Sequence, residues 1–265
     1  MKPNRFKMAL AEGRVPVGHM IMEFGTRGIA KLLETADLDF VVIDMEHTAF
    51  EAERVADLIA WLKATPLAPF VRVPQGLYHF LARAMDAGAL GVMAGNVETP
   101  EQAREIVSAV KYAPLGHRGV GLGGAHTDYV MPDPAAYFAA ANENTTVICQ
   151  IESVRGVQNA ESIAGLPGVD VLWVGHNDLT QSMGIPGQFE DPRFLDALQR
   201  VAAAANSCGK AAAIQPSGFE QAEKWLALGF RALSWKTDIA LYRGALQSEV
   251  KKLREMLAPP RPAAP

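Results

Sequence analysis

The sequence contains few cysteines, no long apolar run and no cluster of basic residues. Its two cysteines, Cys149 and Cys208, are too few for a disulfide framework, which favours a reducing, cytoplasmic environment. No apolar run reaches the ~20 residues that a membrane span requires, and the first residues lack the apolar core of a signal peptide. The net charge is −4, and no Lys/Arg cluster is interleaved with aromatic residues. These absences argue against a membrane partner and against a nucleic-acid partner.

Short apolar runs alternate with amphipathic stretches along the chain, as expected of βα units around a parallel sheet. The length of 265 residues suits a (β/α)8 TIM barrel, which takes about 250 residues. We therefore expect a single α/β domain of this fold over residues 1–258, and a disordered C-terminal tail at residues 259–265. Eight strands are predicted, at residues 16–23, 39–44, 69–73, 90–94, 146–151, 170–175, 211–215 and 231–235.

One segment, Leu115–Asp133, interrupts this alternation with five glycines and no hydrophobic period. A long loop inside a compact domain is usually functional or mobile. Phosphate-binding loops follow a strand and open a helix directly, and this segment does neither. We expect it to fold over the site or to contact a neighbouring subunit.

Charged side chains stand at the C-terminal ends of four predicted strands. The run FVVI leads to Asp44 and His47, and the run APFV leads to Arg72. The run VICQI leads to Glu152, and VLWVGHN leads to Asp178. The carboxyl ends of the strands of a parallel barrel meet at one rim, where such barrels build their active sites. The sequence therefore predicts that these five residues lie together.

Glu152 and Asp178 are candidate metal ligands. Two carboxylates, completed by water and a chelating ligand, form an oxygen-rich site suited to Mg²⁺ or Mn²⁺. The alternative is structural: each acid could cap the helix that follows it, and Glu152 could pair with Arg155. Capping explains each acid singly but does not explain two of them on neighbouring strands.

The basic residues of the rim allow more than one interpretation. Arg72 could hold a carboxylate with two parallel hydrogen bonds, or it could form a surface ion pair. His47 could be a general base oriented by a hydrogen bond to Asp44, or it could cap a helix. Lys236 could be a Schiff-base nucleophile, but that chemistry needs a depressed pKa, and the nearby Asp238 would favour the charged ammonium.

These residues, in this order, resemble the HpcH/HpaI aldolase family of metal-dependent pyruvate aldolases. The resemblance extends from about residue 14 to residue 250 and is carried by the stretches IDMEH, VRVP, DAGALGVMAGNVET, YAPLGHRGVG, QIES and VGHNDLTQSMG. It implies a (β/α)8 barrel that reversibly cleaves a 4-hydroxy-2-keto acid to pyruvate and an aldehyde through a metal-bound pyruvate enolate. The implied cofactor is Mg²⁺, Mn²⁺ or Co²⁺, and the implied assembly is a homo-oligomer, either a hexamer or a trimer of dimers.

The resemblance also implies individual roles. Glu152 and Asp178 correspond to metal ligands, and Arg72 to the residue that holds the pyruvyl group. His47, oriented by Asp44, corresponds to the base. Further residues are implied in substrate binding or at a neighbouring subunit's site: Gln150 in the pocket, the backbone amides of Asn177 and Asp178 for the pyruvate carboxylate, Gln215 near the aldehyde, and Asp86 at the subunit contact.

The chain departs from the family pattern on the aldehyde side. The chain has Gly175-His176-Asn177-Asp178-Leu179-Thr180 where the family usually has Gly-Pro-x-Asp-Leu-Ser. After the fourth strand, Ala94-Gly95-Asn96 replaces a usual Val-Pro pair. Gln215 stands where leucine is common, and Lys236 replaces a small residue. The aldehyde therefore stays open, and so do three other readings: a citrate-lyase-like enzyme acting on an acyl-CoA, a Schiff-base aldolase and a non-catalytic 2-keto-acid-binding barrel.

Overall fold

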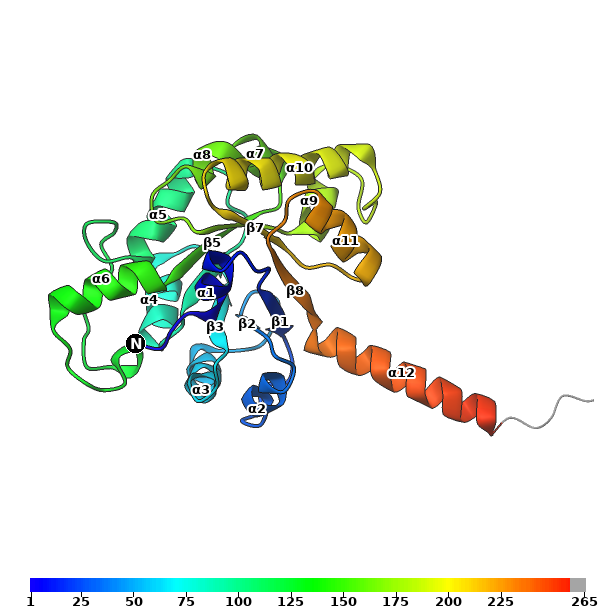
Figure 1. Ribbon diagram of the computed structural model, residues 1–265, viewed down its shortest axis with the longest axis horizontal. Coiled ribbons are helices and arrows are strands. Elements are labelled where there is room, and N and C mark those ends of the chain that lie inside the picture. The colour runs from blue at the N-terminus through cyan, green and yellow to red at the C-terminus, as the bar shows by residue number, and fades with distance from the viewer. Residues whose placement is uncertain (258–265) are drawn as a thin grey trace, which may run out of the picture.

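Eight parallel strands close into a barrel in the order β1 to β8, with β8 paired to β1 (Figure 1). This computed structural model describes residues 1–257, so the tail predicted at residues 259–265 lies outside the described residues. The predicted single-domain (β/α)8 barrel is confirmed, and every predicted strand is present with its ends within two residues. The strands are β1 (Val17–Ile21), β2 (Phe40–Asp44), β3 (Ala68–Val73), β4 (Gly91–Ala94), β5 (Thr146–Ile151), β6 (Val171–Val174), β7 (Ala211–Ile214) and β8 (Ala232–Thr237).

Helices follow the strands and surround the barrel. Three of them begin at a capping side chain followed by proline: Thr99 forms a capping box with Gln102, Asp133 accepts a hydrogen bond from Ala136 N, and Asp191 accepts one from Arg193 N. The helices are α1 (Arg5–Ala11), α2 (Ile29–Glu34), α3 (Ala52–Lys63), α4 (Tyr78–Asp86), α5 (Pro100–Val110), the 3₁₀ turn η1 (Ala125–Thr127), α6 (Pro134–Asn144), α7 (Val154–Gln158), α8 (Ala160–Ala164), α9 (His176–Ser182), α10 (Pro192–Ser207), α11 (Phe219–Ala227) and α12 (Asp238–Met256).

The N-terminal end of the barrel is closed by aromatic side chains. Phe6 of α1 lies edge-on to Phe40 and Phe70, with ring centroids 5.1 and 5.3 Å away. Glycines make room for these rings: a Cβ at Gly91 would lie 2.8 Å from Phe70 Cδ1. A second apolar layer packs between the outer face of the strands and the helices. Because aromatic rings fill the barrel interior at its N-terminal end, an active site inside the barrel would open at the opposite rim, where the strands end.

The segment Leu115–Asp133 packs against the outside of the barrel. Buried Arg118 donates to Asp86 Oδ1 at 2.6 Å and lies 4.8 Å from the Tyr112 ring centroid. Lys63 of α3 donates to the carbonyl of Ala125 at 2.6 Å. No residue of this segment lines either cavity of the site described below. The expectation that it folds over the site is therefore wrong for this chain, while a subunit contact stays a prediction.

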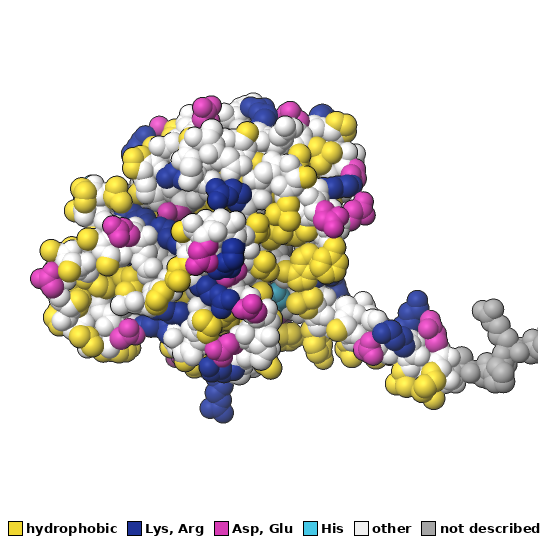
Figure 2. Space-filling model, viewed as in Figure 1, with side chains coloured by type: hydrophobic (Ala, Val, Ile, Leu, Met, Phe, Trp, Pro, Cys, Tyr) yellow, Lys and Arg dark blue, Asp and Glu magenta, His cyan; other side chains and the backbone are white. Residues whose placement is uncertain are grey.

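Helix α12 leaves the barrel after its first turn and projects away from it (Figure 1). Asp238 is its only buried residue. Apolar side chains lie exposed along the projecting part, in yellow in Figure 2. No helix within residues 1–257 is long and apolar enough to cross a membrane. The exposed stripe consists of Ile239, Tyr242, Leu246, Val250 and Leu253 on α12 and of Leu257 directly after it.

Candidate active site

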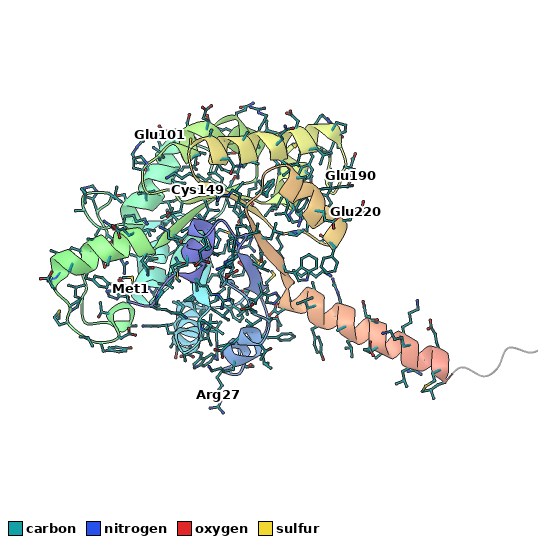
Figure 3. All side chains as sticks on the ribbon, in the orientation of Figure 1. Met1, Arg27, Glu101, Cys149, Glu190 and Glu220 are labelled. Atoms are coloured by element: carbon teal, nitrogen blue, oxygen red, sulfur yellow. The ribbon has the colours of Figure 1, made fainter. Side chains whose placement is uncertain are left out.

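Two adjoining cavities open at the rim where the strands end. The larger has a volume of about 430 Å³ and the smaller about 330 Å³, and His47 and Asp178 line both. The side chains that line them include residues on or directly after β2, β3, β5, β6, β7 and β8. In Figure 3, the label of Cys149 marks β5, the strand that leads to Glu152. The larger cavity contains Arg72, Gln150, Asn177 and Gln215, and the smaller contains Glu152. The structure therefore brings these predicted residues to one place.

The smaller cavity is dominated by carboxylates. Glu152 accepts hydrogen bonds from the backbone N–H of Asn96 and from Nε2 of Gln150. A Cβ at Gly95 would lie 2.9 Å from Glu46 Oε1 and 3.1 Å from Glu152 Oε1. A side chain at position 95 would therefore displace one or both carboxylates from their present positions. The sequence places Glu46 with Asp44 and His47 at the end of the second strand, but it predicted a ligand role only for Glu152 and Asp178, not for Glu46.

The acids of this cavity disfavour one another's ionised forms. Burial raises the pKa of Glu152, and the charges of Glu46 and Asp178 raise it further. Burial also raises the pKa of Glu46, against the opposing effect of Arg72. Adjacent carboxylates that repel one another are stabilised by a cation placed between them. The donor set therefore fits a hard divalent ion.

The protein does not enclose such an ion by itself. Within residues 1–257, no group of three or more His, Cys, Asp or Glu side chains is arranged to hold a metal. A divalent ion coordinated by Glu152 and Asp178 would keep positions for water and for the oxygens of a ligand. Open coordination of this kind is typical of ions that take part in reactions.

Arg72 forms a buried ion pair with Asp44. Its Nε donates to Asp44 Oδ1 at 2.8 Å and its Nη2 donates to Asp44 Oδ2 at 2.7 Å. Its Nη1 lies 3.2 Å from Glu46 Oε2, an ion-pair contact that lacks hydrogen-bond geometry. The alternative of a surface ion pair is wrong, because Arg72 is only 8% exposed. The guanidinium is held in one orientation at the wall of the cavity.

The predicted hydrogen bond between Asp44 and His47 is wrong. The register of β2 and β3 places Asp44 directly beside Arg72, so the carboxylate binds the guanidinium and also accepts from Glu46 N. His47 follows in the loop, with its side chain 57% exposed and its Nε2 3.9 Å from Glu46 Oε2. A two-point bond to a charged fork is stronger than a bond to imidazole. The acid beside His47 is therefore Glu46.

The structural alternatives for the two predicted ligands are also wrong. Ser153, not Glu152, caps the helix that follows β5. Arg155 lies 3.6 Å from Glu98 rather than pairing with Glu152. Helix α9 begins without a side-chain cap, so Asp178 does not serve as one.

Two further predicted residues have distinct settings. Gln150 has an unpartnered, buried Oε1 in the larger cavity. Asp86 lines neither of the two rim cavities and contacts Arg118 on the outer side of α4. Its role at a neighbouring subunit's site stays a prediction.

The part of the wall formed by His176 is less polar. His176 packs against Phe189 and Trp225 at centroid distances of 5.3 and 5.6 Å. Burial lowers the pKa of His176 to about 4, so its imidazole is neutral at pH 7. Met20 and Trp173 also line this side. His176 is therefore part of the packing and brings no charge to the cavity.

Similar proteins share this architecture. The family model described as HpcH/HpaI aldolase/citrate lyase matches residues 25–245. A 5-keto-4-deoxy-D-glucarate aldolase of Shigella dysenteriae serotype 1 is 33% identical over 245 residues, covering 92% of this chain and 94% of the relative. The solved HpcH/HpaI aldolase from Desulfitobacterium hafniense DCB-2 is 30% identical with a TM-score of 0.90, covering 96% of this chain and 97% of that one. Citrate synthase SbnG is 27% identical with a TM-score of 0.86, covering 97% and 99%.

The family match spans most of the chain and both halves of the site. The relatives have names for different reactions, so membership gives the class of chemistry and leaves the second substrate open. On this evidence the chain belongs to the HpcH/HpaI aldolase/citrate lyase family and is an aldolase, a carbon–carbon lyase.

Proposed function

We propose that this chain uses a divalent cation held by Glu152 and Asp178 to cleave a 4-hydroxy-2-keto acid reversibly into pyruvate and an aldehyde. The observation that carries the proposal is the fixed guanidinium of Arg72 beside the acids of the smaller cavity. Breaking a carbon–carbon bond next to a keto group places negative charge on the keto oxygen, and a cation and a guanidinium together stabilise it. The name of the similar 5-keto-4-deoxy-D-glucarate aldolase denotes a dicarboxylic keto acid derived from a sugar, which supports a sugar-acid substrate.

The cation would be Mg²⁺, Mn²⁺ or Co²⁺. When bound, it supplies Lewis-acid stabilisation of the keto oxygen and the carboxylate of the 2-keto acid. Both oxygens of Glu152 already accept hydrogen bonds, from Asn96 N–H and Gln150 Nε2. The direction of this carboxylate is therefore set before any ligand arrives, as outer hydrogen bonds do at metal sites.

The pyruvyl group would be held by three kinds of donor. Arg72 faces the keto oxygen, and Asp44 keeps its side chain ordered without the substrate. The backbone N–H groups of Asn177 and Asp178 precede the first hydrogen bond within α9, from Leu179 N to Gly175 O at 2.9 Å. They have no acceptor within the helix and would donate to the substrate carboxylate. Gln150 and Gln215 would add side-chain hydrogen bonds.

His47 would move the proton. It lines the larger cavity together with Arg72 and Gln215, and the smaller cavity together with Glu152, so it lies between the proposed metal ligand and the groups that would bind the substrate. Its imidazole would accept the proton of the C4 hydroxyl as the C3–C4 bond breaks, and it would return the proton during aldol addition. Glu46, with Oε2 3.9 Å from His47 Nε2, would orient the ring and stabilise its protonated form.

The test of this proposal is exchange of the methyl protons of pyruvate in deuterated water, measured by NMR together with aldol product formation. Both reactions should be lost after thorough treatment with EDTA and should return with Mg²⁺, Mn²⁺ or Co²⁺. Exchange reports proton loss at the methyl carbon and needs no aldehyde. Exchange and product formation that survive chelation would refute metal-dependent chemistry, and binding of pyruvate without exchange would identify a non-catalytic barrel.

We further propose that the chain forms a homo-oligomer, a hexamer or a trimer of dimers, through the exposed stripe of α12. The stripe residues recur every three or four positions, as on one face of a helix that packs against a partner.

Replacing both Leu246 and Leu253 by aspartate should reduce the assembly to smaller species, because each charge would be buried in an apolar contact. Light scattering after size exclusion measures the mass. Ser248→Asp, on the opposite face, should leave the mass unchanged; an unchanged mass in the double variant would place the contact elsewhere.

A further inference from the structure

Strand β8 contains a bulge at the rim of the larger cavity. Gly18 pairs with Ser234, but Met20 pairs with Thr237. Between these two pairs β8 therefore has one residue more than β1, which is the bulge. His19 Nδ1 donates to the carbonyl of Trp235 at 2.9 Å inside this bulge. Lys236 has a φ of +56°, a backbone conformation that L-residues other than Asn and Asp seldom adopt. Bulges near active sites redirect side chains, and here Lys236 becomes part of the cavity wall.

The charge of Lys236 has no partner on the protein. Within residues 1–257, no carboxylate oxygen lies within 4.0 Å of its Nζ. The nearest acid along the chain, Asp238, instead accepts from the backbone N–H groups of Met22, Glu23, Phe24 and Ile239 at 2.8–3.0 Å. The Nζ atom lies 5.4 Å from the Trp235 ring centroid, and this ring stacks on Phe219 at 4.6 Å.

Two acids on and beside the neighbouring helix α11 contact Lys224 rather than Lys236. Glu220 lies 3.4 Å from Lys224, and Glu190 lies 2.9 Å from the same lysine. Figure 3 labels both acids, which lie on and beside α11. By contrast, the second cation of the cavity, Arg72, already contacts two carboxylates. Lys236 is therefore the cation of this wall that is free to bind an anion brought by a ligand.

Two polar, uncharged side chains follow the neighbouring strand β7. Gln215 and Ser217 offer an amide and a hydroxyl in the same cavity as Lys236. Arg72 and the α9 amides lie at the pyruvyl part of the same cavity. The cavity thus has positive charge in two places: at Arg72 and the α9 N–H groups, where the keto acid would bind, and at Lys236.

We propose that Lys236 is a specificity-determining residue that selects aldehydes carrying a carboxylate, with Gln215 and Ser217 binding hydroxyl groups between that carboxylate and the reacting carbon. This inference rests on the proposed function, since it names the acceptor of the same reaction. The natural acceptor is then a hydroxylated aldehyde acid, and the full substrate is a dicarboxylate.

The test compares acceptors that differ only in charge. With the metal-loaded enzyme, kcat/KM for aldol addition of pyruvate is measured for 2-hydroxy-3-oxopropanoate against glyceraldehyde, and for succinic semialdehyde against butanal. Lys236→Met should lower the preference for the charged aldehyde by about 10- to 100-fold, the value of a charge-assisted hydrogen bond, mainly through KM. Lys236→Arg should keep the preference within about 5-fold, because the charge is retained. Both replacements are unbranched and tolerate the positive φ as lysine does.

Lys31→Met, which removes the same charge from the exposed face of α2, is the matched control and should behave as the wild type. A preference that stays within about 2-fold of wild type in Lys236→Met, for both pairs, would overturn the inference. So would a borohydride-trapped pyruvate adduct on Lys236, which would make this residue a nucleophile. Methyl-proton exchange of pyruvate distinguishes failure of the proposed function from failure of the inference about Lys236. If the wild type shows no metal-dependent exchange, the proposed function is wrong, and this inference is wrong with it. If exchange is normal but the aldehyde preference of Lys236→Met is unchanged, only the role of Lys236 is rejected.

Discussion

Replacing Glu152 with glutamine is expected to lower kcat/KM for cleavage by about 10³-fold or more. A Lewis acid contributes several kcal/mol of transition-state stabilisation, and each 1.4 kcal/mol is a factor of about ten in rate. The amide oxygen of glutamine is a weaker ligand than a carboxylate and brings no charge. Steady-state release of pyruvate, measured over a range of Mn²⁺ concentrations, distinguishes weaker metal binding from a lower maximal rate.

The same variant is expected to fold. Glutamine can still accept the hydrogen bond from Asn96 N–H, and its amide N–H₂ can donate to Gln150. Gln150 needs only an amide rotation for this, because its Oε1 has no hydrogen-bond partner in the structure. A loss of activity in a folded protein therefore reports on the site and not on the barrel.

Thermal stability provides a second readout for Glu152→Gln. The folded-state pKa of Glu152 is raised above its ordinary value, so at neutral pH the ionised carboxylate opposes folding, and this cost is absent at pH values below the unfolded pKa. Neutral glutamine removes it, and the metal-free variant should melt no lower than the metal-free wild type. Mn²⁺ should raise the Tm of the wild type, as any ligand of the native state does, but not that of the variant. Glu143→Gln, on the exposed surface of α6, is the control and should keep the metal-dependent increase; an equal increase in Glu152→Gln would exclude Glu152 as a ligand.

The barrel and its rim were predictable because their signals are local. Each strand is a short apolar run, and helices begin at caps such as Thr99 and Asp191 that satisfy backbone N–H groups. Parallel strands in one barrel have their carboxyl ends at one rim, so the charged residues after the runs had to meet there. Glu152, Asp178, Arg72 and His47 lie together for that reason.

The partners within the site were not predictable in the same way. Asp44 binds Arg72 because the register of β2 and β3 places them side by side. The register between two strands cannot be predicted from the sequence of either strand alone. His47 lies three residues from Asp44 in sequence, which suggested a hydrogen bond that the turn does not allow. The bulge that directs Lys236 into the cavity likewise depends on how β8 meets β1. Beyond Tyr242, which packs on Phe24 at a centroid distance of 5.4 Å, the apolar face of α12 has no partner within the described chain.

Replacing Arg72 is expected to affect both stability and catalysis, and the two effects can be separated. In Arg72→Met, Asp44 would remain fully buried without its counter-charge, which costs about 3–5 kcal/mol of unfolding free energy. Arg72→Lys keeps a positive charge but not the two-point fork, so it should fold with a smaller loss of stability. Its kcat/KM should fall by about 10²–10³-fold, the range seen when one preorganised donor to a developing oxyanion is removed. Urea unfolding and pyruvate release measure the two quantities.

The double variant Asp44→Asn/Arg72→Met provides the decisive comparison. It removes both charges of the buried pair, and the introduced asparagine can still accept the hydrogen bond from Glu46 N that Asp44 Oδ1 accepts now. A buried pair replaced by neutral groups is often as stable as the original, so the double variant should recover most of the stability that Arg72→Met loses. Activity should not recover, because no guanidinium faces the keto oxygen. Recovery of both would mean that Arg72 acts only by neutralising Asp44. Recovery of stability alone would show that its charge is also used on the substrate.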